Sequence, residues 1–164
     1  MPLWRNKTPN VTPPVWHGSW RVPLHDPAAY TLYENDAVVA GQCEDTGHLR
    51  AAKSNQGYLS LSIGFPPALI RPSAHGVLYG VYGHVDLPKG LDHSLRMGIS
   101  RTDHTEFMSP KHRGANDLMA VFELPPPQQR GITALWVDLI YHGDAQGDIS
   151  WSHLRIEWRQ KFIL

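Results

Sequence analysis

The sequence of 164 residues contains a single cysteine, Cys43, and no excess of charge of either sign. One cysteine excludes an internal disulfide framework and a cysteine-based zinc site, so Cys43 is interpreted as a buried or loop thiol. Lysine plus arginine number 15, as do aspartate plus glutamate, and the formal net charge at pH 7 is therefore zero. Without a long-range field of one sign, nucleic acid and anionic membranes are not expected partners.

The sequence also lacks a long apolar run. The first residues, MPLWRNKTPNVTPPVW, contain neither the apolar region of a signal peptide nor the roughly 18 apolar residues of a membrane span. We therefore expect a protein that is made and kept in the cytoplasm. Clean helical periodicity between two caps is missing as well, while 14 glycines and 14 prolines are spread along the chain, so little helix is expected.

What the sequence does contain is strict alternation of apolar and polar residues, which is typical of half-buried strands. Leu59, Leu61 and Ile63 alternate with polar neighbours, and Leu95, Met97 and Ile99 do the same, which points Arg96 outward. Strands are predicted over residues 58–63, 77–86, 93–100, 118–124, 132–142 and 148–158, and the last two are expected to form a hairpin. Residues 37–40 and 48–52 fit a short strand or a loop equally well.

The pattern predicts an all-β fold, a two-sheet antiparallel sandwich or jelly roll over residues 23–164, behind an extended arm over residues 1–22. The arm holds four prolines, which disfavour a helix or a central strand. Trp4, Trp16 and Trp20 lie in or beside it, and such large apolar rings need burial. Two readings stay open: the arm folds back over its own domain, or the three tryptophans form an assembly anchor on a neighbouring subunit.

From residue 57 onward the order of strands and turns resembles the jelly-roll carbohydrate-binding modules of the galactose-binding-like superfamily. The segments that carry the resemblance are VLYGVYGHVDLPKG, HSLRMGIS, LMAVFELPPP and ITALWVDLIYHGDAQGDISWSHLRIEW. In the last segment the apolar phase changes after Trp151, which predicts a bulge near Ser152 and His153. Such modules often place an aspartate there for a structural calcium ion. Serine and histidine suit calcium poorly, so no metal or other cofactor is expected.

Catalytic motifs are not found in the sequence. Its ten histidines include no His-x-His and no HExxH pattern, and the nucleophile elbow and the glycine-rich phosphate loops are missing too. We therefore expect no catalytic residues and no enzyme. Sugar binding needs exposed aromatic rings with polar groups beside them on one strand face. The alternation offers Tyr82, His84, Arg96, Trp136 and Asp138 as one such patch, if their faces coincide. The competing reading places Trp136 and Tyr82 in the core.

A sugar-binding domain without a signal peptide differs from modules that are secreted with an enzyme. These features together predict a non-enzymatic structural component of a bacteriophage virion, a minor tail or capsid decoration protein, made in the host cytoplasm. Its arm would attach it to other virion subunits or to a second copy, and a cell-surface glycan is a possible ligand. The alternative is a stand-alone carbohydrate-binding, lectin-like module.

Overall fold

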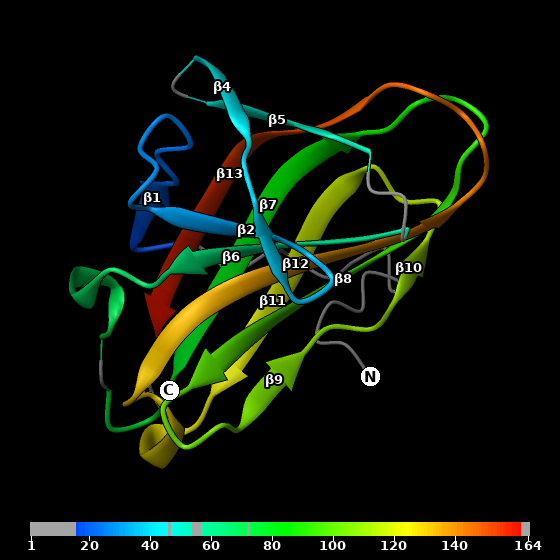
Figure 1. The fold of residues 1–164 in the computed structure, drawn as a ribbon. Helices are drawn as coiled ribbons and strands as arrows, with labels where there is room; N and C mark the ends of the chain where they lie inside the picture. Colours follow the sequence, from blue (N-terminus) through cyan, green and yellow to red (C-terminus); the bar gives the residue numbers. More distant parts are fainter. Residues whose placement is uncertain (1–15, 46, 54–56, 72, 162–164) are drawn as a thin grey trace.

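The computed structural model describes residues 16–45, 47–53, 57–71 and 73–161. It confirms the all-β prediction: two antiparallel sheets pack face to face, and the helical turns in the described residues are two short 3-10 segments, Pro67–Leu69 and Pro126–Gln128. In Figure 1 the long strands of both sheets run diagonally across the view, with the β4–β5 hairpin at the top and β9 at the bottom.

The two sheets are called sheet A and sheet B. Sheet A has the order β11-β7-β13-β5-β4, with β1 also paired to β13, and sheet B has the order β10-β8-β12-β6-β2-β3, with β9 also paired to β8. Sheet A comprises β1 (Gly18–Arg21), β4 (Gln42–Asp45), β5 (His48–Ala52), β7 (Val77–Asp86), β11 (Asp117–Leu124) and β13 (Asp148–Gln160). Sheet B comprises β2 (Tyr30–Glu34), β3 (Ala37–Val39), β6 (Tyr58–Gly64), β8 (Asp92–Arg101), β9 (Glu106–Met108), β10 (His112–Arg113) and β12 (Ile132–His142).

The core lies between the sheets and is built from the apolar phase of each strand. Leu95, Met97 and Ile99 of β8 are at most 1% exposed, as predicted from their alternation. From sheet A, Trp151 and Tyr79 are the largest fully buried side chains in the described residues. Burial of such a side chain contributes about 1.5–3 kcal/mol of transfer free energy. A slip of one residue would expose all the apolar side chains of a strand, so their burial determines which face of each sheet points outward.

The predicted hairpin of the last two long strands is wrong. β12 pairs with β6 and β8 in sheet B, whereas β13 pairs with β5, β7 and β1 in sheet A. The connection over residues 143–147 therefore crosses from one sheet to the other, and its two glycines, Gly143 and Gly147, have positive φ angles. The turn between β7 and β8 makes the same change of sheet. Alternation shows which side chains are buried, but it does not show whether two successive strands share a sheet.

The segment predicted as an arm joins the sandwich at its C-terminal end. Gly18–Arg21 forms β1, and Trp20 lies opposite Ile156 of β13 and packs on the core. Trp16 contacts the outer face of sheet A over Gly80 and Tyr82. Both tryptophans thus lie against their own domain, while Trp4 lies outside the described residues. Residues 37–39 and 48–52, for which strand and loop both stayed open, are strands.

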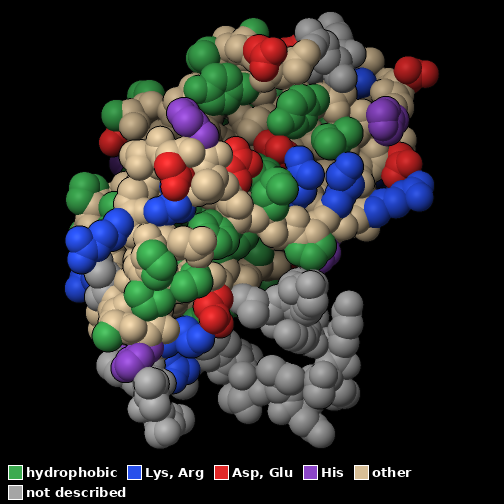
Figure 2. Space-filling view, turned by 90° about the horizontal axis from the view of Figure 1, so that it is seen from below, with side chains coloured by type: hydrophobic (Ala, Val, Ile, Leu, Met, Phe, Trp, Pro, Cys, Tyr) green, Lys and Arg blue, Asp and Glu red, His purple; other side chains and the backbone are tan. Residues whose placement is uncertain are grey.

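The surface is mixed in charge. On the face shown in Figure 2, lysine and arginine side chains are interspersed with aspartate, glutamate and hydrophobic ones. A basic stripe of the kind that follows a phosphate backbone is not seen on this face. Among the described residues, no helix has the length and apolar character needed to cross a membrane.

Candidate functional site

The structure divides the five residues of the predicted sugar patch between the two sheets. Arg96, Trp136 and Asp138 come together on the outer face of sheet B, because Asp138 lies opposite Arg96 and two residues from Trp136. Tyr82 and His84 belong to β7 and lie on the outer face of sheet A. The five side chains therefore form no single patch, since the turn after β7 carries the chain to the other sheet.

The register of sheet B lines up polar side chains from four neighbouring strands. One row across the sheet runs Tyr33, Ser60, Asp138, Arg96, from β2 through β6 and β12 to β8. The next row in register includes Ser62 and Trp136 and continues through Gly98 of β8 to β9. Residues in register across a sheet share a face, so these side chains all point away from the core.

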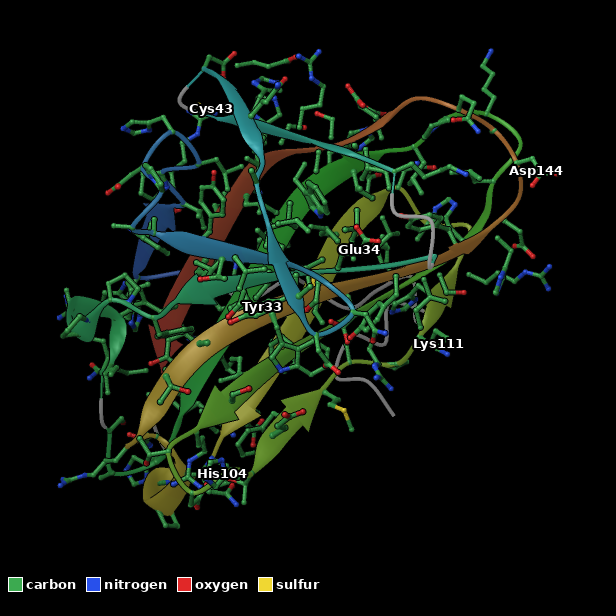
Figure 3. All side chains as sticks on the ribbon, in the orientation of Figure 1. Tyr33, Glu34, Cys43, His104, Lys111 and Asp144 are labelled. Carbon is green, nitrogen blue, oxygen red and sulfur yellow. The ribbon has the colours of Figure 1, made fainter. Side chains whose placement is uncertain are left out.

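These two rows line an open cleft of about 380 Å³. The cleft is lined by Tyr33, Tyr58, Ser60, Ser62, Arg96, Glu106, Trp136 and Asp138. Figure 3 shows Tyr33 near the middle of the molecule, whereas Cys43 and Asp144 lie at its ends. A cleft of this volume, with aromatic rings and converging polar groups, has the size and chemistry of a small-molecule or oligosaccharide site.

The indole of Trp136 lies directly over its neighbour across the ladder, Gly98, because a glycine leaves room for it. A Cβ atom built on Gly98 would come within 2.1 Å of the indole ring, so the ring occupies the space that any other side chain would need. The guanidinium carbon of Arg96 lies 5.7 Å from the ring centre, within reach of a cation–π contact. The indole is half-buried and forms a platform beside the polar row.

Asp138 forms the floor of the cleft and is only 8% exposed. Its Oδ1 accepts a hydrogen bond from the Ser60 hydroxyl at 2.6 Å, and its Oδ2 lies 3.9 Å from a guanidinium nitrogen of Arg96. Burial raises the pKa of the neighbouring Tyr58, and the charge and hydrogen bond of Asp138 raise it further. These contacts leave a buried carboxylate with acceptor capacity at the floor of an open cleft.

Two buried donors of the cleft have no partner. The Nε of Arg96 and the indole Nε1 of Trp136 are buried and form no hydrogen bond within the described residues. An unsatisfied buried donor costs about 1–3 kcal/mol, so such groups are uncommon without a reason. Both belong to residues that line the same cleft. Bound hydroxyl groups or water are the partners that their chemistry requires.

Exposed apolar side chains stand at both ends of the cleft. Val38 of β3 lies in register with Tyr33 at one end, and Met108 of β9 lies in register with Gly98 at the other. They are 68% and 56% exposed, the two highest values among the large hydrophobic side chains that the structure describes. Five strand spacings separate β3 from β9, roughly 24 Å, which is longer than one sugar ring.

Tyr82 lies in a different environment on sheet A. Trp16 meets its ring edge-on at 6.4 Å between centroids, and the guanidinium of Arg155 covers it at 4.7 Å. The ring is thus enclosed by two neighbours from its own chain. Neither Tyr82 nor Trp136 belongs to the core, so the competing reading for these two residues is not what the structure shows.

His84 joins two strands of sheet A. Its Nδ1 lies 2.9 Å from a carboxylate oxygen of Asp117 on β11, and its Nε2 lies 3.0 Å from one of Asp86. The hydrogen bond with Asp117 is the largest cause that raises the pKa of His84, burial opposes it, and Asp86 adds to the rise. His84 therefore links β7 to β11 through hydrogen bonds, distant from the cleft on sheet B.

The predicted bulge in β13 is present, because the register with β7 shifts between Ser152 and Arg155. His153 has a φ of 55° there, a left-handed conformation that is uncommon for a residue other than glycine. The guanidinium of Arg21 donates to its Nδ1 at 3.0 Å, so a side-chain cation already lies at this bulge. No group of three or more potential metal ligands is found among the described residues.

Five of the eight residues that line the cleft were not predicted. For three of them a signal existed, because Tyr58, Ser60 and Ser62 occupy the outward phase of the predicted strand at residues 58–63. Tyr33 lies on β2, where no strand was predicted. Glu106 lies in an aperiodic polar stretch, and its position depends on the pairing of β9 with β8. Only the order of strands in the sheet brings these residues together.

Comparisons with known proteins identify the fold. No protein-family model and no curated protein sequence matches the chain. A xylan-binding module, CBM15, is similar in structure, with a TM-score of 0.54 and 9% identity over 88% of this chain and 99% of that one. The CBM22-1 xylan-binding domain of Xyn10C from Paenibacillus barcinonensis has a TM-score of 0.50 and 11% identity over 88% and 94% of the two chains. The chain therefore has the jelly-roll fold of these carbohydrate-binding modules.

Proposed function

We propose that this protein is a non-catalytic carbohydrate-binding module whose ligand lies in the cleft on sheet B. The observation that carries the proposal is Trp136, which lies directly over Gly98 beside the polar row of Ser60, Asp138 and Arg96. Sugars present apolar ring faces that stack on aromatic side chains and hydroxyl groups that bond polar ones. The cleft supplies both within one face. The similar structures, described as xylan-binding, support the same reading.

The arrangement favours a chain of sugars over a single one. The polar row crosses four strands, and Val38 and Met108 extend the face beyond both ends of the row. A ligand that reached from one to the other would run across the strands. Contact along such a length would add affinity without any deep pocket.

Two acidic residues in the cleft raise the question of glycoside hydrolysis. Asp138 lies opposite Arg96 on one side of β8, and Glu106 lies opposite Ser100 on the other side. The two acidic residues are offset by four residues along the strand direction and by two strand spacings across the sheet. Their Cα atoms are therefore roughly 16 Å apart. Side chains of a strand stand roughly perpendicular to the sheet, so the two carboxyl groups keep about this separation, whereas the paired carboxyl groups of glycosidases are about 5–9.5 Å apart. This geometry supports binding rather than cleavage.

The virion role stays a prediction. It depends on an arm that attaches to a neighbouring subunit, but Trp16 and Trp20 contact their own sheet A. Trp4, the third member of the predicted anchor, lies outside the described residues. No observation among the residues that the structure describes favours the virion role over glycan binding, so the lectin-like alternative becomes the main proposal.

The proposal is tested with a glycan array followed by calorimetry on the glycans that bind. Trp136→Ala removes the platform and is expected to weaken binding at least about tenfold, because a central aromatic side chain carries much of the binding energy in such sites. Tyr82→Ala is the matched control on the opposite sheet and is expected to leave affinity unchanged. Equal loss in both variants, or no glycan bound at all, would contradict the proposal.

A further inference from the structure

The charges that face the cleft are unequal in sign. Among the described residues that line it, Arg96 is the only cation, whereas Asp138 and Glu106 are both acidic. Arg96 lies 3.9 Å from Asp138 and over the ring of Trp136, so the charges of Arg96 and Asp138 partly offset each other and Glu106 leaves the lining acidic by one charge. A ligand in the cleft therefore meets a net negative surface.

The buried position of Asp138 strengthens its effect on a ligand. At 8% exposure the carboxylate is less screened by water than a charge on the open surface. The neighbouring Tyr58 responds to this field, because the charge of Asp138 contributes to the raised pKa of its hydroxyl after burial itself. A second negative charge brought near Trp136 would meet the same field.

Asp138 also has a requirement of its own. An ionised carboxylate accepts hydrogen bonds and donates none, and in this structure Asp138 accepts them from the hydroxyl groups of Ser60 and Tyr58. Its remaining acceptor positions suit the hydroxyl groups of a neutral sugar. A sugar carboxylate or sulfate group offers acceptors only, so it would give Asp138 no further donor while adding charge repulsion.

We infer that the cleft selects uncharged glycans and rejects those that carry a carboxylate or sulfate group next to Trp136. This selectivity rests on the proposed function and concerns the same site. It makes Asp138 a specificity-determining residue that acts through both its charge and its acceptor oxygens. The nearby Arg96 offsets part of this charge, so the excess of acidic groups decides the preference.

An array that carries neutral, uronic acid-containing and sulfated glycans provides the first test. The measurement is then repeated on a matched pair with one backbone: xylo-oligosaccharides with and without a glucuronic acid branch. The acidic member of the pair is expected to bind at least about tenfold more weakly, equivalent to about 1.4 kcal/mol. This gap should narrow as salt rises, whereas binding of the neutral member should change little.

Asp138→Asn separates charge from shape. Asparagine keeps an oxygen acceptor and removes the negative charge, so this variant should bind neutral glycans more weakly and lose most of the preference against acidic ones. Asp144→Asn removes the same charge from an exposed loop at the end of the molecule (Figure 3) and should preserve both affinities and their ratio. Thermal melting of each variant shows whether it remains folded.

The outcomes distinguish the two proposals. Binding of neutral glycans together with a preference that Asp138→Asn removes supports both. If acidic glycans bind as tightly as neutral ones, or if the preference survives in Asp138→Asn, the selectivity is wrong while the binding function stands. If no glycan of any class binds, the proposed function is wrong, and the selectivity falls with it.

Discussion

Gly98 determines how Trp136 is presented. The two residues lie opposite each other on β8 and β12, and the indole fills the volume directly above the glycine. A large residue at this place would force the ring to turn away from the sheet. The function of the cleft thus depends on Gly98, although this residue has no side chain with which to contact a ligand.

Gly98→Ala is expected to weaken glycan binding at least about tenfold while the fold is retained. The added methyl group would lie 2.1 Å from the indole, so the platform must move. The change is followed by calorimetry and by tryptophan fluorescence. Gly64→Ala is the matched control in the same sheet, because nothing lies within 4 Å of its new Cβ atom. Equal affinity in the two variants would show that the position of Trp136 over Gly98 is unimportant.

At the residue scale, alternation predicted the outward side chains well. Arg96, Trp136 and Asp138 were found because apolar neighbours on both sides fix their phase. Tyr82 and His84 were outward as well, but on the other sheet. The alternation of apolar and polar residues in β7 has the same form as that in β8 and β12. It shows which side chains point outward, but not the sheet to which a strand belongs.

At the scale of elements, the link between β7 and β11 depends on the protonation of His84. Asp117 extends from β11, and Asp86 lies two residues along β7. Ser152, the residue opposite on β13, is uncharged. A protonated imidazole donates to both carboxylates, whereas a neutral one can donate from a single nitrogen. The pKa of His84 is raised above its ordinary value of 6.5, chiefly by Asp117.

The pKa of His84 is higher in the folded state than in the unfolded chain. The contribution of His84 to stability is therefore complete below about pH 6.5 and is lost as the pH rises through the folded pKa. His84→Gln should therefore lower the melting temperature at acidic pH more than at pH above the folded pKa. The side chains are well exposed, so the difference is at most about 1 kcal/mol, or about 2–4 °C for a domain of this size. His25→Gln, an exposed control, should show no such trend. If the loss of melting temperature in His84→Gln grew with pH, the link between β7 and β11 through a protonated His84 would be wrong.

The elements themselves were largely predictable, but their connections were not. The strand at residues 132–142 matches β12 at both ends, and the bulge near Ser152 was found from the change of apolar phase. The turns after β7 and β12 have the composition of hairpin turns, with glycine and polar residues, yet both cross between the sheets. Turn chemistry allows a reversal of direction without specifying the partner of the next strand.

At the scale of the whole molecule, the fold class followed from composition and period, whereas the cleft required the complete order of sheet B. Tyr33, Ser60, Asp138 and Arg96 come from strands that are far apart in the sequence. Their meeting depends on the pairing of β2 with β6, β6 with β12 and β12 with β8. Such long-range pairing leaves no local signal that a single sequence displays.

The N-terminal segment distinguishes the two functions at this scale. A truncation that removes residues 1–15 keeps Trp16 and β1, and it should leave both the melting temperature and glycan affinity unchanged if the module acts alone. Removal of residues 1–21 also deletes β1 and Trp20, which packs on the core, and should lower stability by about 2 kcal/mol or more.

Light scattering of the full chain is expected to report a monomer, because Trp16 and Trp20 are already in contact with their own sheet. A stable ring or dimer that disappears when residues 1–15 are removed would favour the virion prediction instead, since only a segment that binds neighbouring subunits gains area from such an assembly.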